Sequence, residues 1–203
     1  MNSLSQKKFE QLQQKSEPFE ALLYDVDGTL ADNMHAHKAA YVATSEEFGI
    51  VLDDRIVDEL AGWPTVAVAK EIGLRYNVSI DEHAFAQRKS AIFIERFIRQ
   101  TVAIDYVMEH LLANIGKKKI GLVSGGSRST LEITLDVIGL TGKFETLVCA
   151  GDTAEGKPSP QPFLLAAAHL QVAPSACLVF EDGDPGVQGA IATGMGWIRV
   201  DQL

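Results

Sequence analysis

The sequence is poor in the features that would place it in a specialised class of protein. Its 203 residues include only two cysteines, Cys149 and Cys177, which are too few for a disulfide framework. Each cysteine stands in a short apolar run, so we expect two buried, free thiols in strands and a reducing, cytoplasmic location. The N-terminus is polar and the apolar runs are too short to cross a bilayer, so we expect neither a signal peptide nor a membrane partner.

Positive charge is also scarce. The 18 lysine and arginine residues against 27 aspartate and glutamate residues leave a formal net charge of −9. The phosphates of nucleic acids select basic surfaces, so we expect no nucleic-acid partner. A small phosphorylated substrate stays compatible with this charge, because local lysines and a metal ion can bind it whatever the overall sign.

The most informative stretch that the chain does contain is Asp-Val-Asp-Gly-Thr-Leu at residues 25–30. It follows the apolar run Ala21–Tyr24, which predicts a buried strand. Two carboxylates, Asp25 and Asp27, therefore stand at the end of a strand, which is where ligands bind in open α/β sheets. Like charges this close require a cation or a shared proton, and a hard divalent ion with oxygen ligands suits them. A plain surface turn is the alternative interpretation.

Helical rather than alternating apolar patterns fill the next part of the chain. They predict four helices, with breaks at Gly49, Gly62–Pro64 and Asn77. The expected ranges are 34–48, 55–60, 65–76 and 81–99. Four helices without an intervening strand predict a helical cap inserted over the strand ends. Residues 1–19 read as an N-terminal extension, either one loosely docked helix or a frayed tail.

From Asp105 onward, strand and helix patterns alternate. Strands are expected at residues 120–123, 147–150, 177–180 and 197–200, with a helix at 129–138 and others begun by Ser159-Pro160 and Asp184-Pro185. This alternation predicts an α/β fold, a doubly wound, Rossmann-like parallel sheet. We expect the core to comprise residues 20–32 and 101–203 and the inserted cap to comprise residues 33–100.

Polar side chains follow the other expected strands as well. Ser124, Lys157 and the pair Glu181-Asp182 each come after an apolar run. Because parallel strands end at the same edge of a sheet, these groups should converge on Asp25 and Asp27. Singly, each has an ordinary alternative as a turn serine, a solvated lysine or a charged helix cap. Their occurrence together and in this order is what points to one site.

This ordered set resembles the haloacid dehalogenase superfamily of aspartate-nucleophile phosphatases and mutases. The four matching motifs are DVDGT at residues 25–29, the Ser124 hydroxyl, Lys157 in GKPSP, and Glu181-Asp182 in VFEDGD. The helical insert looks like the small α-helical cap of that superfamily. Within it, the likeness is closest to the sugar phosphatases and β-phosphoglucomutases.

The resemblance implies a role for each motif residue. Asp25 would attack phosphorus and Asp27 would carry the proton, while Ser124, Gly125 and Lys157 would hold the phosphoryl oxygens. The implied cofactor is Mg²⁺. Its ligands would be the Asp25 carboxylate, the Asp27 backbone carbonyl and Asp182, with Glu181 beside them or as an additional ligand.

Two cap residues also match positions of interest in these relatives. His37 stands where they often carry a histidine, and Lys89 resembles a substrate-facing lysine of the mutases. Residues 62–65 either face the site or form a plain helix–helix turn. Because they lack the arginine that the mutases place there, hydrolysis is favoured over isomerisation.

We therefore expect a monomeric or weakly dimeric Mg²⁺-dependent phosphatase acting on a small phosphorylated metabolite, a sugar phosphate. A β-phosphoglucomutase-like isomerase is the alternative, and a non-catalytic binding protein on the same fold is a remote one. The complete set of acidic, hydroxyl and lysine groups argues against a binding protein, which needs neither a nucleophile nor a proton donor.

Overall fold

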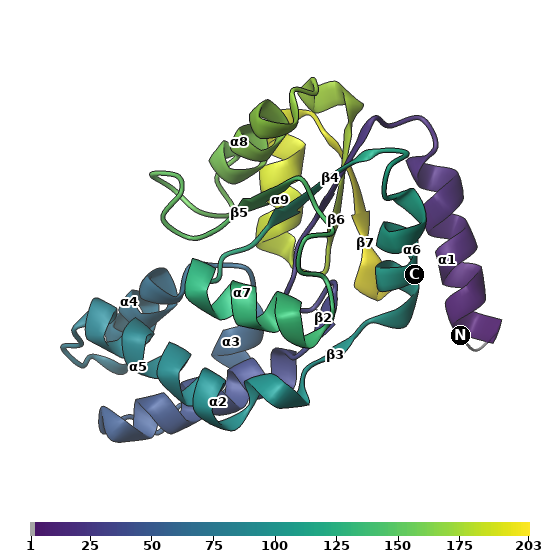
Figure 1. Ribbon diagram of the computed structural model, residues 1–203. Coiled ribbons are helices and arrows are strands. Elements are labelled where there is room, and N and C mark those ends of the chain that lie inside the picture. The colour runs from purple at the N-terminus through teal and green to yellow at the C-terminus, as the bar shows by residue number, and fades with distance from the viewer. Residues whose placement is uncertain (1–2) are drawn as a thin grey trace.

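The computed structural model describes residues 3–203, and a five-stranded parallel sheet forms its centre (Figure 1). The strand order is β5-β4-β1-β6-β7, with β1 hydrogen-bonded to β4 on one side and to β6 on the other. The strands are β1 (Ala21–Tyr24), β4 (Lys119–Val123), β5 (Thr146–Val148), β6 (Cys177–Glu181) and β7 (Gly196–Arg199). The expected doubly wound α/β fold is confirmed.

Helices cover both faces of the sheet. One face packs against α8 (Gln161–Leu170) and α9 (Asp184–Thr193), and the other against α1 (Ser3–Ser16), α6 (Asp105–Asn114) and α7 (Arg128–Val137). Every side chain of β1 and β6 is buried, as the continuous apolar runs of a sandwiched parallel strand require. Within the described chain, no helix combines the length and apolar character needed to span a bilayer.

The N-terminal helix α1 is docked more tightly than we expected. Leu12 and Ser16 are completely buried, and Leu12 belongs to the same apolar cluster as β1 and β6. The Ser16 hydroxyl lies 2.9 Å from His110 Nε2 on α6, and His110 Nδ1 lies 2.8 Å from the Tyr24 hydroxyl on β1. Both partners of His110 are therefore supplied from sequence positions far from it. Residues 1 and 2 of the expected extension lie outside the described part.

The inserted helices stand away from the sheet, on the side of its carboxyl-terminal strand ends (Figure 1). They are α2 (Met34–Glu47), α3 (Arg55–Glu59), α4 (Thr65–Tyr76) and α5 (Glu82–Arg96), followed by a 3₁₀ turn at Ile98–Gln100. Two antiparallel two-residue strands, β2 (Ala31–Asp32) and β3 (Val102–Ala103), join them to the rest. The sequence analysis missed this ribbon, because strands of two residues carry no detectable periodicity. It lies where we expect the boundary between core and cap.

Some element ends differ by a residue or two from the expected ones. Helix α8 begins at Gln161 with Pro160 before it, and α9 begins at Asp184 after Gly183, so neither Ser159 nor Asp184 occupies the expected cap position. Strand β5 ends at Val148, which places Cys149 just beyond it. Both cysteines are buried and free, as expected.

Candidate active site

The site begins where β1 ends. The Asp25 backbone N–H donates to the Phe180 carbonyl at 3.0 Å, so the ends of β1 and β6 stay paired up to the two acidic motifs. Gly28 then turns the chain with a φ of +90°, a conformation that favours glycine. A Cβ atom on Gly28 would collide with Asp182 Oδ2. The glycine of the first motif thus lets Asp182 approach Asp25.

Lys157 reaches this point from the loop after β5. Its ammonium group lies 2.6 Å from Asp25 Oδ1, 2.5 Å from Glu181 Oε1 and 2.8 Å from the Val123 carbonyl. The lysine and both carboxylates are buried. Burial alone would lower the pKa of Lys157, but the two carboxylates more than offset it and raise that pKa above its ordinary value. The lysine therefore stays charged inside the protein.

One lysine does not balance the carboxylates around it. Oxygen atoms of Asp25, Glu181 and Asp182 all lie within 4.8 Å of one another. Burial, followed by the charge of Asp25, raises the pKa of Asp182 to about 7 and raises that of Glu181 as well. Burial also raises the pKa of Asp25, although Lys157 opposes the shift. A compact set of hard oxygen donors with excess negative charge fits a divalent cation such as Mg²⁺.

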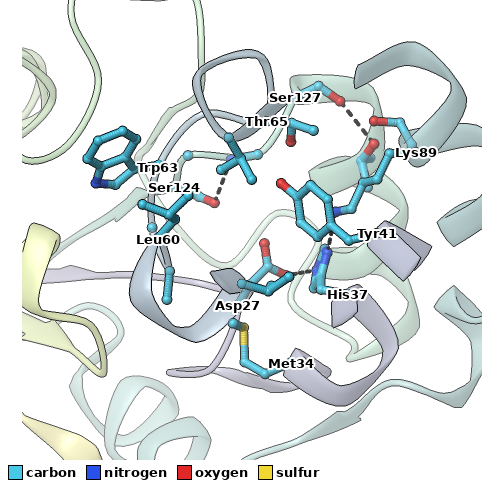
Figure 2. A pocket seen from close by; sticks show the side chains of 18 of the residues that line it. Asp27, Met34, His37, Tyr41, Leu60, Trp63, Thr65, Lys89, Ser124 and Ser127 are labelled. Carbon is cyan, nitrogen blue, oxygen red and sulfur yellow. Dashed lines mark hydrogen bonds and ion pairs between the residues drawn. The ribbon is translucent and has the colours of Figure 1, made fainter. Parts of the chain in front are cut away.

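Asp27 faces the cap helices and has very different neighbours. Asn33 Nδ2 donates to Asp27 Oδ1 at 2.6 Å, and His37 Nε2 lies 3.2 Å from the same oxygen. Lys89 Nζ lies 2.6 Å from His37 Nδ1, which completes a chain from α5 through α2 to the first motif (Figure 2). Although burial works to raise the pKa of Asp27, the neighbouring His37, Asn33 and Lys89 lower it to about 2.

Aromatic rings enclose this chain of polar groups. The His37 ring stacks on Phe93 with centroids 4.1 Å apart, and Lys89 Nζ lies 4.5 Å from the centre of the Tyr41 ring. Burial lowers the pKa of Lys89 to about 8 and, with Lys89 beside it, lowers that of His37. An ammonium that donates to Nδ1 leaves the Nε2 proton of a neutral imidazole to face Asp27. Lys89 is thus committed to His37.

A pocket of about 70 Å³ brings most of the expected site residues together. Its lining includes Asp25, Asp27, His37, Lys89, Ser124 and Gly125, while Lys157, Glu181 and Asp182 lie around Asp25. The Ser124 hydroxyl accepts the Gly126 N–H at 3.1 Å. Residues 61–63 and Thr65 also line the pocket, with Trp63 beside Ser124, so this turn faces the pocket (Figure 2).

Sequence reasoning missed several residues of the site. Asn33 precedes α2 and looks like a helix cap, but its side chain turns to Asp27 and makes no cap bond. Three hydroxyl-bearing residues of the cap and of the loop after β4 also went unnoticed, because such residues are common on helices and turns. They are Tyr41, Ser90 and Ser127.

The profile of the haloacid dehalogenase-like hydrolases matches residues 19–194, and this range contains every acidic and lysine group of the site. The chain belongs to this family of hydrolases. Helix α1 lies outside the matched range.

Members with assigned activities include both phosphatases and a mutase. The fructose-1-phosphate phosphatase YqaB of Escherichia coli is 29% identical over 92% of this chain and 99% of its own length. The β-phosphoglucomutase of Bacillus subtilis is 28% identical over 90% of this chain and 83% of its own. A β-phosphoglucomutase structure from Clostridium difficile has a TM-score of 0.78 at 25% identity, covering 88% of this chain and 83% of that one.

Proposed function

We propose that the chain is a magnesium-dependent phosphatase that hydrolyses a sugar phosphate through a phosphorylated Asp25. One observation carries the proposal, namely that the two carboxylates of the first motif have separate partners. Asp25 lies in the buried cluster with Lys157, whereas Asp27 contacts Asn33 and His37. Phosphoryl transfer through an aspartate needs a nucleophile and a separate proton carrier, which a simple binding protein does not.

Two half-reactions follow from this arrangement. In the first, an oxygen of Asp25 bonds to phosphorus, the bond from phosphorus to the sugar oxygen breaks, and Asp27 gives its proton to the departing alkoxide. Asp27 is ionised in the free protein, but a phosphoryl dianion beside it raises its pKa, because like charges disfavour the ionised form. In the second, Asp27 takes a proton from water as the water oxygen attacks phosphorus. Inorganic phosphate leaves and Asp25 is restored.

Several groups of the chain would stabilise the transferred phosphoryl group. Lys157, the Ser124 hydroxyl and the Gly125 N–H would donate to its oxygens as negative charge spreads over them. The Asp25 and Asp182 carboxylates and the Asp27 carbonyl would hold Mg²⁺, with Glu181 as a further ligand or as a neighbour bound to Lys157. When bound, the ion supplies positive charge that offsets these carboxylates and the phosphoryl oxygens.

The hydroxyl-bearing part of the pocket lining supports a neutral, hydroxyl-rich leaving group. Tyr41, Thr65, Ser90, Ser127 and Thr130 contribute hydroxyl groups to it. Hydroxyls donate and accept hydrogen bonds, which matches the hydroxyls of a sugar. The fructose-1-phosphate phosphatase relative, whose whole length the alignment nearly covers, supports the same substrate class.

The basic groups support hydrolysis over isomerisation. A mutase must also hold the second phosphate of a bisphosphorylated sugar, a task that suits bidentate arginine. Of the described residues that line the pocket, the basic ones are His37 and Lys89, and these are bound to each other. Arg128, just beyond the pocket, pairs with Asp152 instead.

The test is a screen of phosphorylated metabolites for phosphate release with Mg²⁺, followed by a product assay. In the assay the protein receives β-glucose 1-phosphate and a trace of the 1,6-bisphosphate. We expect turnover of one or more sugar phosphates, with free phosphate forming faster than glucose 6-phosphate. Faster formation of glucose 6-phosphate would make the enzyme a mutase, and turnover of no phosphorylated metabolite would refute the proposal.

A further inference from the structure

The turn between α3 and α4, residues 61–64 and called the cap turn below, touches three loops of the core at three glycines. A Cβ atom on Gly125, after β4, would lie 2.5 Å from the Gly62 carbonyl oxygen. One on Gly156, before Lys157, would lie 2.5 Å from Pro64 Cγ and 3.0 Å from its Cδ. One on Gly183, after β6, would lie 3.3 Å from the Ala61 carbonyl oxygen.

The backbone does not require glycine at these positions. Gly125 and Gly156 have φ values outside the left-handed region, and Gly183 has a φ of −109° with ψ of 145°. Any residue can adopt such angles. The three atoms nearest to an added methyl group belong to residues 62 and 63 at Gly125 and to Pro64 at Gly156, so the cap turn is what each methyl group would meet first. These three residues, the glycine seat, let the turn lie directly on the loops that carry Ser124, Lys157 and Asp182.

We propose that Pro64 and Gly156 are positioning residues of this enzyme, which set how closely the cap turn closes over Asp25. The proposal rests on the phosphatase function above, because closure matters for a reaction in which water must enter only at the second step. Neither residue offers a group to the substrate or the metal. They act through the cap turn, whose Gly62 and Trp63 line the pocket beside Ser124 and Gly125 (Figure 2).

The geometry gives the size of the effect. Carbon atoms in contact lie about 3.5–4.0 Å apart. A methyl group at position 156 would therefore push Pro64 away by about 1 Å or more, and the cap turn would lie farther from Asp25. Displacements of that size near a reacting centre cost about a hundredfold in rate. The collision involves only Cγ and Cδ of the proline ring, since Pro64 Cβ stays 4.0 Å from the added methyl.

Compensating substitutions test the proposal. Gly156→Ala should lower kcat/KM by about 10- to 100-fold, and Pro64→Ala should be a milder change. The double variant should recover activity to within about threefold of Pro64→Ala alone, because alanine lacks the colliding atoms. Wild-type activity in Gly156→Ala, or a double variant as poor as Gly156→Ala, would overturn the proposal.

A second readout does not depend on turnover. The chain has two tryptophans, Trp63 in the cap turn and the exposed Trp197 on β7. In a Trp197→Phe background the fluorescence of Trp63 reports on the turn alone. Gly156→Ala should increase quenching of Trp63 by acrylamide, and Pro64→Ala should reverse the increase. Unchanged quenching of Trp63 in both variants would refute the positioning role even if the phosphatase proposal holds. A metabolite screen without turnover would refute the phosphatase proposal but would not change the quenching result.

Gly126→Ala is the matched control. Gly126 neighbours Gly125, but its added methyl would meet Leu131 of the core at 3.1 Å and not the cap turn. Whatever that variant loses should not be recovered by Pro64→Ala. Recovery of activity in the Gly126→Ala, Pro64→Ala double variant would mean that removing the proline ring raises activity without relieving a specific collision. That result would contradict the proposed role of Pro64 and Gly156.

Discussion

Asp25 and Asp27 are one residue apart in the chain, but they belong to two electrostatically opposite regions. Around Asp25 the core loops gather two further carboxylates and one lysine, and the pKa values of all three carboxyls rise. Around Asp27 the cap helices supply His37 and Lys89, and the pKa falls to about 2. The region of Asp25 carries excess negative charge that a cation would offset, whereas the negative charge of Asp27 has basic neighbours within the protein. The cap residues thus set the surroundings of Asp27, while the core loops set those of Asp25.

The largest expected effect comes from replacing the proposed nucleophile, Asp25. Asp25→Asn keeps the shape of the side chain but leaves an amide, which does not attack phosphorus. Phosphate release on the best substrate of the screen should fall by at least about a thousandfold, with an unchanged circular dichroism spectrum. A variant that keeps most of its rate would show that phosphate does not pass through Asp25.

The next effect concerns the Mg²⁺ ion proposed for the region of Asp25. Asp182→Asn removes one of the few carboxylates available to Mg²⁺. Losing an indirect metal partner costs about 10- to 100-fold in affinity, and a direct ligand should cost no less. Isothermal titration with Mg²⁺ measures the change. Asp184→Asn is the control, because that exposed carboxylate pairs with Arg199, and its Mg²⁺ affinity should match the wild type. Equal Mg²⁺ affinities in the wild type and both variants would show that Asp182 is not a metal ligand.

A smaller effect should appear when the region of Asp27 loses its outer charge. In Lys89→Met the side chain still fills the space beside the Tyr41 and Phe93 rings. The pKa of Asp27 rises, however, because one nearby cation is gone. We expect kcat to fall by about tenfold, at the low end of acid–base contributions, because His37 loses the ammonium group that orients its ring toward Asp27. The acid limb of kcat should move to higher pH, because Asp27 must be ionised to take a proton from water. Arg88→Met, on the same helix but paired with Glu47 at the surface, should change neither. An acid limb at the wild-type pH would show that Lys89 does not influence the protonation of Asp27.

The two regions were not equally predictable from sequence. Asp25, Ser124, Lys157 and Asp182 follow apolar runs, and the rule that parallel strands end at one sheet edge is enough to bring them together. The bond from Asn33 to Asp27 could not be predicted, because an asparagine before a helix looks like an ordinary cap. The histidine and lysine partners depend on how two helices cross, which no local pattern specifies.

The tight docking of α1 was hidden for a related reason. Leu12 and Ser16 look like ordinary residues of a polar helix. The hydrogen-bond partner of the Ser16 hydroxyl, His110, lies 94 positions further along the chain. Burial lowers the pKa of His110 to about 4, so this histidine is neutral near pH 7. Contacts made at such sequence separations follow from the packed fold alone.

The smallest expected effect is on the pH dependence of stability without metal. Unfolded carboxyls titrate near pH 4, whereas folded Asp182 titrates at about 7 and the pKa values of Glu181 and Asp25 are also raised. Between these values the three carboxyls bind more protons in the folded protein, so their contribution to the free energy of unfolding falls as pH rises. His37 and His110, whose pKa values are lowered by burial, oppose this fall only up to about pH 6.5. Asp27, with a pKa of about 2, acts only below this window.

Thermal unfolding in EDTA between pH 5 and pH 8 measures the trend. The midpoint should fall by several degrees, because about 1 kcal/mol shifts it by roughly 2–4 °C in a domain of this size. Asp182→Asn should flatten the fall, since it removes a titrating carboxyl, and should make the metal-free protein more stable at pH 8. A midpoint that rises across this range would mean that the carboxylates around Asp25 are already balanced, and the contrast between the two regions would disappear.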